Sequence, residues 1–343
     1  MLGKKVKNIE IKKGEKISEL IDAFSEAGGF TAKKLATASG IFKDMQRDKQ
    51  CVKFLSFPAD VISTGLRGVI VDLVKSKSVD VIITTCGTLD HDLARVWKDY
   101  YAGTEMSDDA KLRQEGINRL YDIFIPNDSY GYILEDKLMP ILKEAASFQK
   151  EYSTSELIDF IGGKISRERN AKESIVFWAW KNKIPIIVPG ITDGSVGSQI
   201  WMYSQKDKNF RINLLKDEDL LAGIVFKAKK SGALMLGGGI SKHHTIWWNQ
   251  FKNGLDYAIY MTTAVEWDGS LSGARLEEAI YSKRFISAIL FASFTASGLN
   301  SPSIIFVISS KSMSSAFSKL LLLTCEKTAR YPLLLLICIS AYA

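Results

Sequence analysis

The feature that most constrains the fold of this chain is a series of short apolar segments, each ending in small or polar residues. These segments span residues 52–57, 79–83, 184–188, 233–236 and 257–261. Continuous apolar runs of this length, separated by helical stretches, are typical of parallel strands buried on both faces of a sheet. The pattern therefore predicts an α/β fold of Rossmann-like type, a largely parallel sheet with helices on both faces.

The residues before the first apolar segment predict an N-terminal helical extension. Apolar residues recur there at helical spacing from Ile17 to Phe24, and two glycines end the pattern at 28–29. A second helix is expected to begin at Thr31. We therefore divide the chain into three parts. These are an N-terminal helical segment (1–50), an α/β domain (51–280) and a tail (281–343).

The composition is that of a chain that buries a sizeable core. Of its 343 residues, 46% are hydrophobic and 24% are charged, which excludes disordered, collagen-like and disulfide-stapled proteins. The four cysteines show no CxxC and no metal-type spacing, so we expect a reducing, cytoplasmic setting. No apolar run follows Met1, and no signal peptide is expected.

The net charge of +7 lies mostly in the tail. Residues 1–283 hold 40 basic and 37 acidic residues, whereas residues 284–343 hold 5 basic residues and 1 acidic residue. The body is thus nearly balanced, as on an ordinary solvated surface. A positive net charge can attract nucleic acid, but this distribution leads us to expect no nucleic-acid partner.

The tail differs in composition from the rest of the chain. No charge occurs from Phe285 to Ser310, and 12 of the last 60 residues are serine. The uncharged run exceeds the about 20 residues that cross a bilayer, but Asn300, Pro302 and the serines dilute its apolar character. Three interpretations stay open: a membrane span, a buried C-terminal element, or a segment that is not the natural continuation of the protein. We expect no membrane association.

The three histidines all lie where apolar segments end. His91 stands between two aspartates, and His243 and His244 follow a glycine-rich turn. Ligands of parallel sheets bind beyond the carboxyl ends of the strands, and histidine suits proton transfer near neutral pH. The alternative is an ordinary surface or core histidine. Two adjacent histidines without acidic or thiolate ligands make a poor metal site, so we predict no metal.

Six acidic residues lie in or near the same turns. Several of them around one cleft would favour a polycationic ligand or bind the ribose hydroxyls of a dinucleotide; for Asp60 and Asp193 the alternative is that they cap the helices that follow. The dinucleotide fingerprint GxGxxG is absent. The six are Asp60, Asp90, Asp92, Asp193, Asp268 and Glu278.

Seven segments in chain order resemble the deoxyhypusine synthase family, in its archaeal form. They are GGFTAKKL (28–35), TTCGTLDHDL (84–93), EGINR (115–119), ITDGSVG (191–197), GGGISKHH (237–244), NGLDYAIY (253–260) and EWDGSLSGARLEEA (266–279). The resemblance implies a transferase of hypusine biosynthesis. In that family spermidine is oxidised with NAD, and the aminobutyl group passes as an imine to an enzyme lysine. It then moves to a lysine of the hypusine-bearing translation factor precursor.

The resemblance also implies a homotetramer, an NAD-binding catalytic domain over residues 51–280, and a set of site residues. The implied NAD contacts are Asp60, Ser63, Thr85, Cys86, Gly87, Asp193, Gly238, Thr263 and Ala264. The implied spermidine contacts are His91, Asp268, Gly269, Ser270 and Glu278, with His243 as a catalytic residue beside the polyamine. His91, Ser198 and Leu271 replace acids of the eukaryotic branch, so the implied pocket is less negative here.

The chain departs from the family at the nucleophile. The family carries its catalytic lysine in a Ser-Trp-Gly-Lys motif shortly after Glu-Ala, whereas Tyr281-Ser282-Lys283 follows Ile280 here. Lys283 is our candidate nucleophile, which must lose its proton to react; the alternative is a solvent-facing lysine. Because the resemblance ends where charge and serine content change, we hypothesise a reading-frame disruption near codons 280–282.

Two further functions share these residues. A homospermidine synthase uses the same scaffold but transfers the aminobutyl group to putrescine. A catalytically impaired subunit would keep the NAD and partner surfaces without a working lysine. Supplying free putrescine distinguishes the first, and borohydride trapping with labelled spermidine distinguishes the second.

Overall fold

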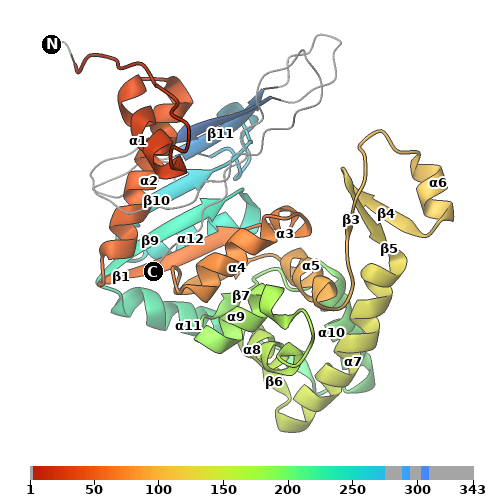
Figure 1. The fold of residues 1–343 in the computed structure, drawn as a ribbon. Helices are drawn as coiled ribbons and strands as arrows, with labels where there is room; N and C mark the ends of the chain where they lie inside the picture. Colours follow the sequence, from red (N-terminus) through yellow and green to blue (C-terminus); the bar gives the residue numbers. More distant parts are fainter. Residues whose placement is uncertain (1–2, 275–287, 294–302, 309–343) are drawn as a thin grey trace. The chain divides into compact units, whose positions relative to one another are not determined.

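The computed structural model describes residues 3–274, 288–293 and 303–308, and the chain divides into two compact units (Figure 1). The first unit comprises residues 1–56 and 224–343, and the second comprises residues 57–223. The domain boundaries that we placed at residues 50 and 280 stay predictions.

The first unit is built on three parallel strands in the order β10-β9-β1. Phe54 of β1 and Ala258 of β10 both pair with Ala233 of β9. These residues are buried, as expected for a sheet covered on both faces. The strands are β1 (Cys51–Phe57), β9 (Lys230–Leu236) and β10 (Tyr257–Met261); β11 (Ala288–Ser293) and β12 (Ser303–Ile308) form an antiparallel pair.

The N-terminal helical extension is confirmed. α1 (Ile17–Ala27) ends where the sequence predicted, because Gly28 adopts a left-handed φ of 69° that closes the helix. α2 (Phe30–Arg47) follows at once and buries one apolar face. The remaining described elements of this unit are α12 (Gly239–Gln250) and the short helix η3 (Glu266–Asp268), and α11 (Leu214–Lys227) spans the boundary between the units.

The second unit carries two further parallel strands, with Ile82 of β2 paired with Ile186 of β7. Helices of the same unit lie around the labelled strand β7 in Figure 1. The principal elements are β2 (Val81–Thr84), β7 (Ile186–Ile187), α3 (Asp60–Ser63), α4 (Arg67–Lys75), α5 (Cys86–Trp97), α7 (Gly131–Phe148), α8 (Thr154–Ile165), α9 (Ile175–Asn182) and α10 (Ser195–Lys206). Shorter ones are η1 (Asn127–Ser129), η2 (Ala171–Glu173), and the parallel pair β6 (Glu151–Tyr152) and β8 (Arg211–Ile212).

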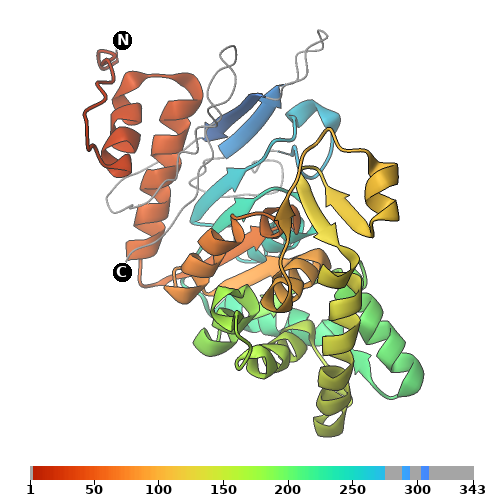
Figure 2. The same cartoon turned by 45° about the vertical axis from the view of Figure 1, so that its right-hand side comes forward.

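A small antiparallel sheet forms an arm of the second unit (Figure 2). Its order is β3-β5-β4, and α6 precedes β4 in the chain. The elements are β3 (Tyr101–Ala102), α6 (Asp109–Gln114), β4 (Ile117–Leu120) and β5 (Ile123–Pro126). The sequence did not predict this arm, because its strands have only two to four residues and the apolar run of β5 is only three residues long before Pro126.

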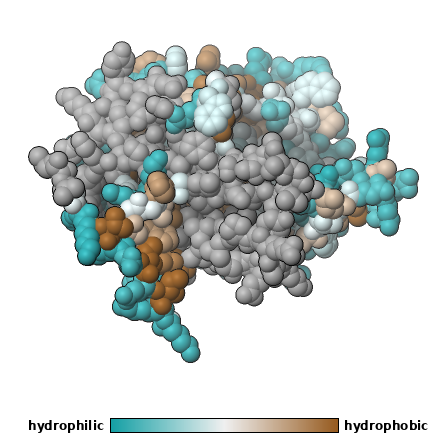
Figure 3. Space-filling model, turned by 90° about the horizontal axis from the view of Figure 1, so that it is seen from above, coloured by the Kyte–Doolittle hydropathy of each residue, from teal (hydrophilic) through white to brown (hydrophobic). Residues whose placement is uncertain are grey.

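The α/β class with a largely parallel sheet is confirmed: every described pairing among β1, β2, β7, β9 and β10 is parallel. None of the described helices has the length and apolar character needed to cross a bilayer. Most of the uncharged run 285–310 lies outside the described residues. Figure 3 shows hydrophobic residues beside hydrophilic ones on the face seen from above. The N-terminal part exposes large apolar side chains, among them Ile11 and Phe30.

Candidate active site

In the second unit, strand β2 ends at Thr84 and delivers the chain directly into helix α5. The Thr84 hydroxyl donates to the backbone oxygen of Phe57, the first residue of this unit, over 2.6 Å and so fixes the end of β2. Thr85 precedes the helix and caps it with no side-chain bond. Its hydroxyl is buried and has no hydrogen-bond partner among the described residues. A ligand at this turn would therefore meet a donor that is ready to bind.

The turn around Asp60 and Ser63 packs against the start of α5. The Ser63 hydroxyl donates to the backbone oxygen of Asp60 over 2.7 Å, and the Asp60 side chain is exposed. A Cβ atom on Gly87 would lie 2.8 Å from the Cβ of Ala59, so only glycine fits there without a shift. The structure thus brings four predicted cofactor residues, Asp60, Ser63, Cys86 and Gly87, into neighbouring turns.

The loop after β7 joins the same cluster. A Cβ atom on Gly194 would lie 2.7 Å from both Asp90 Oδ2 and Cys86 Sγ, and the Gly197 amide donates to Cys86 Sγ over 3.4 Å. Asp193, directly before Gly194, is exposed. Burial, assisted by the Asp90 carboxylate, raises the pKa of the Cys86 thiol. Cys86 therefore stays protonated and packs the loop rather than acting as a nucleophile.

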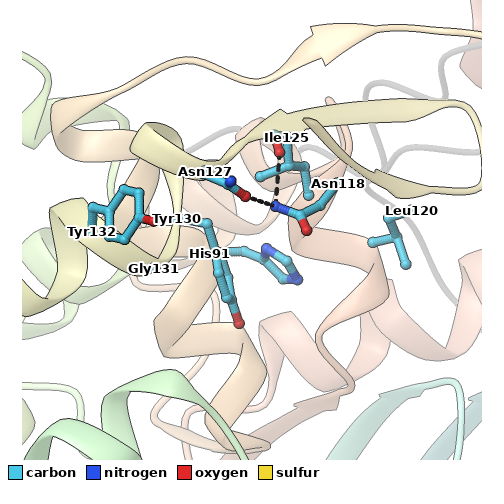
Figure 4. A pocket seen from close by; sticks show the side chains of 8 residues that line it. All are labelled: His91, Asn118, Leu120, Ile125, Asn127, Tyr130, Gly131 and Tyr132. Atoms are coloured by element: carbon cyan, nitrogen blue, oxygen red, sulfur yellow. Dashed lines mark hydrogen bonds between the residues drawn. The ribbon is translucent and has the colours of Figure 1, made fainter. Parts of the chain in front are cut away.

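His91 lines a pocket of about 450 Å³ between α5 and the arm (Figure 4). Its Nδ1 lies 2.9 Å from the Tyr100 hydroxyl, and its ring centroid is 5.4 Å from that of Tyr130. Burial, with a smaller effect of the Arg95 guanidinium, lowers the pKa of His91 to about 4. The imidazole is therefore uncharged near neutral pH. The described lining is His91, Asn118, Leu120, Ile125, Asn127, Tyr130, Gly131 and Tyr132.

The side-chain amides of Asn118 and Asn127, which both line this pocket, form a hydrogen bond. Asn118 Nδ2 donates to the backbone oxygen of Ile125 over 3.2 Å and to Asn127 Oδ1 over 2.9 Å. These bonds fix the two strands of the arm at the mouth of the pocket. None of the described lining residues is acidic, so the polarity at this point comes from amides, hydroxyls and a neutral imidazole.

In the first unit, the chain leaves β9 through a glycine turn into α12. Gly237 and Gly239 have φ values of 67° and 68°, a region that favours glycine. A Cβ atom on Gly238 would lie 2.4 Å from Ser272 Cα, and the Gly239 amide donates to Ser272 Oγ over 3.1 Å. Gly238, a predicted cofactor residue, therefore sits directly against the 269–274 turn.

His243 lies one turn into α12 on its exposed side. Its ring stacks on Trp247 with centroids 5.9 Å apart. Thr263 and Ala264 follow β10, and the Ala264 amide donates to Thr262 Oγ1 over 3.1 Å. The α12 face of this unit thus carries an accessible imidazole at His243.

The 269–274 turn is tied down by the buried Lys242. Its ammonium donates to the backbone oxygens of Leu271 over 2.9 Å and Ala274 over 2.7 Å, and lies 3.6 Å from the ring centroid of Tyr260. Gly269 opens the turn with a φ of 71°. Gly269 and Ser270 are thus held beside α12. Glu278 and Lys283 lie outside the described residues. Their predicted roles therefore stay predictions.

The described residues fit a cofactor with phosphate and hydroxyl groups. The unpartnered Thr85 hydroxyl stands at the N-terminus of α5, where the first backbone N–H groups have no intrahelical acceptor and attract anions. Glycines at 87 and 238 admit backbone close to neighbouring atoms. No group of three or more His, Cys, Asp or Glu side chains within the described part of the chain is placed to hold a metal ion.

The comparison with protein families decides the relationship. The family model described as deoxyhypusine synthase matches residues 19–288. The chain belongs to the deoxyhypusine synthase family. The family that the seven segments predicted is therefore confirmed.

Individual relatives agree with this family membership. A probable deoxyhypusine synthase of Picrophilus torridus is 58% identical over 284 residues, covering 83% of this chain and 90% of that protein. One of Thermoplasma acidophilum is 54% identical over the same shares of both chains. A crystal structure of a putative deoxyhypusine synthase from Entamoeba histolytica has a TM-score of 0.56 at 23% identity, covering 76% of this chain and 88% of that one. That likeness shows the deoxyhypusine synthase fold.

Sequence reasoning missed several residues that contact the predicted site residues. Asp90 was grouped with the other acids but given no role, and Tyr100 and Tyr130 were not considered. Tyr130 lies 40 positions from Asp90, to which it donates a hydrogen bond over 2.7 Å. The only sequence signal was the segment around residue 90, because a tyrosine in a loop has no pattern that distinguishes it.

Proposed function

We propose that this chain is a deoxyhypusine synthase. It would transfer the aminobutyl group of spermidine, through an imine on an enzyme lysine, to a specific lysine of the hypusine-bearing translation factor precursor. The observation that carries the proposal is the 58% identity to a protein named probable deoxyhypusine synthase over nine tenths of that protein's length. The proposal includes a homotetramer that works in the cytoplasm, as the family resemblance implies.

The proposed cofactor is NAD, which would accept a hydride and later return it. In the second unit the Thr85 hydroxyl and the N-terminus of α5 would bind its polar groups, with Cys86 and Gly87 beside them. Asp60, Ser63 and Asp193 stand in the turns next to these residues. In the first unit, the proposed contacts are Gly238, Thr263 and Ala264. The unpartnered Thr85 hydroxyl supports this assignment.

The proposed spermidine contacts include a histidine that does not repel cations. Spermidine carries ammonium groups at neutral pH, and a charged imidazole beside them would oppose binding. Because burial lowers the pKa of His91 to about 4, its ring is uncharged and can accept a hydrogen bond. His243, Asp268, Gly269, Ser270 and Glu278 complete the proposed set, and His243 would move a proton beside the polyamine.

The proposed nucleophile is Lys283. A catalytically impaired subunit is the second candidate function, and one observation favours it: Tyr281-Ser282-Lys283 stands where the family carries Ser-Trp-Gly-Lys. The position of the lysine matters because a misplacement of about 1 Å can cost about a hundredfold in rate.

Borohydride trapping tests both functions. We would incubate the protein with NAD and labelled spermidine, reduce with borohydride, and map the label. A deoxyhypusine synthase gives NAD-dependent label on Lys283, which Lys283→Ala abolishes and Lys229→Ala, at an exposed lysine, leaves unchanged. Transfer to the translation factor precursor completes the assay.

Each other outcome has a distinct meaning. Absence of label on the enzyme contradicts the synthase and supports the impaired subunit. Transfer to free putrescine in preference to the protein acceptor identifies a homospermidine synthase. Label on a different lysine keeps the activity but moves the nucleophile.

A further inference from the structure

We infer that Asp90 is a positioning residue that fixes the Asp193–Gly194 turn against the Cys86–Gly87 turn. These two turns hold residues that we propose for NAD binding, and the inference rests on that proposed function where it concerns the cofactor. Asp90 itself would touch neither NAD nor spermidine.

The Asp90 carboxylate is fully engaged inside the protein. Only 1% of the residue is exposed. Its Oδ1 accepts from the Val196 amide over 2.7 Å, and its Oδ2 accepts from the Ser195 amide over 2.8 Å and from the Tyr130 hydroxyl over 2.7 Å. The Cys86 thiol also lies 3.8 Å from Oδ1, so the contacts described for this carboxylate are all with groups of the protein itself.

These bonds supply the N-terminal cap that helix α10 lacks. The residue before the helix is Gly194, which has no side chain to bind the first amides. A carboxylate from α5 takes that role instead, and its negative charge interacts favourably with the positive end of the α10 dipole. Helix α10 and the turn before it are therefore held by a residue of α5.

The two turns also interlock through Cys86, one helical turn before Asp90. Cys86 Sγ lies 3.8 Å from Asp90 Oδ1, and the Gly197 amide donates to the same sulfur. Gly194 fits between Asp90 and Cys86 only because it lacks a Cβ atom. Cys86 and Asp90, which are four residues apart on α5, thus both accept hydrogen bonds from backbone amides in the first turn of α10.

Asp92 provides an internal comparison on the same helix. It is equally buried and caps α9, accepting from the Ile175 and Val176 amides over 3.0 Å each. It also accepts from the Arg67 guanidinium over 2.8 Å. None of these described contacts involves a residue proposed for NAD binding. Asp92 is thus also a buried carboxylate that caps a helix, but it has an ion pair with Arg67 and does not lie between the two turns.

Tyr130 links Asp90 to the start of α7, directly after the arm. Removing its hydroxyl deletes one of the bonds that orient the carboxylate and so weakens its hold on the α10 amides. Tyr130→Phe is therefore the milder second variant.

The experiment compares Asp90→Asn, Asp92→Asn and Tyr130→Phe in the full chain. An asparagine at 90 keeps the shape but directs an NH₂ group at one α10 amide, so donor faces donor. We expect Asp90→Asn to raise the Kd for NAD about tenfold, the effect of losing one hydrogen bond to a charged group. Asp92→Asn is expected to lower the Tm and leave the Kd within about twofold. Isothermal titration calorimetry measures the Kd.

Amide hydrogen exchange measures directly how firmly the turn at residues 194–197 is held. Asp90→Asn should speed exchange at residues 194–197, and Asp92→Asn should speed it at residues 175–178. The inference is overturned if exchange at 194–197 in Asp90→Asn equals that of the unsubstituted protein, or if Asp90→Asn and Asp92→Asn weaken NAD binding equally.

The outcome for the proposed function is separate. If the unsubstituted protein binds no NAD, the proposed cofactor site is wrong, and exchange at 194–197 alone decides whether Asp90 positions the turn. If Asp90→Asn does not fold, Tyr130→Phe takes its place. It should speed exchange at 194–197 and raise the Kd for NAD about threefold, and no change in either measurement would overturn the inference.

Discussion

At the scale of single residues, the half-buried His91 makes the stability of the protein depend on pH. Its pKa in the folded protein is lowered by burial to about 4, below the ordinary 6.5. Between these values the unfolded chain binds a proton that the folded chain does not. The free energy of unfolding therefore falls as the pH drops from 6.5 towards about 4.

Replacing His91 should flatten this dependence. We expect His91→Gln to reduce the loss of unfolding free energy between pH 7 and pH 5 by about 1–2 kcal/mol. Urea unfolding at the two pH values measures it. His243→Gln, on the exposed side of α12, is the control and should keep the original dependence. An unchanged dependence in His91→Gln would show that another group causes it.

At the scale of elements, the start of α10 packs closely against the loop that follows β7. A Cβ atom on Gly197 would lie 2.0 Å from the Ile191 backbone oxygen and 2.8 Å from Thr192 Cα. Gly197→Ala must push the helix off this loop, and we expect a loss of about 1–3 kcal/mol in the free energy of unfolding.

Gly223 in α11 is the matched control. A Cβ atom there meets nothing within 4 Å, so Gly223→Ala should stabilise the helix by about 0.5–1 kcal/mol. Urea unfolding of both variants gives the comparison. Equal stability of the two would contradict the close approach of α10 to the loop.

The strands that the sequence predicted are those whose own residues form a continuous apolar run. The apolar runs became β1, β2, β7, β9 and β10 because strands buried on both faces need continuous apolar residues. The arm at residues 101–126 was missed because its strands are only two to four residues long and the apolar run of β5 is interrupted by Pro126.

The residues of the candidate site also fall into two groups, those that the sequence could indicate and those that it could not. The strand pattern alone singled out Asp193 as an acid at a strand end, whereas the family resemblance supplied the expected role of Thr85. Asp90 could not be recognised as the cap of α10, because the amides that it binds lie 105 and 106 positions further along the chain. No local pattern records a contact at that separation.

At the scale of the whole molecule, the family match and the nucleophile disagree. The family model matches residues 19–288, a span that includes Tyr281-Ser282-Lys283 in place of Ser-Trp-Gly-Lys. If the body is that of a synthase and only the lysine is displaced, restoring the motif restores the reaction. We expect a variant with Ser-Trp-Gly-Lys in place of residues 281–283 to form the trapped spermidine adduct about a hundredfold faster, since correct placement of a reacting group contributes an effect of this size.

The matched control for this variant carries Ser-Trp-Gly-Arg at the same place. It has the same length and charge but no amine that can form an imine, so it should give no label at that position. If both variants label equally, the adduct forms elsewhere and the motif is not what the chain lacks. If neither labels while both bind NAD, the fault lies beyond the motif. In that case the residues that follow it, where serine content and charge change, become the part of the molecule that separates this chain from an active synthase.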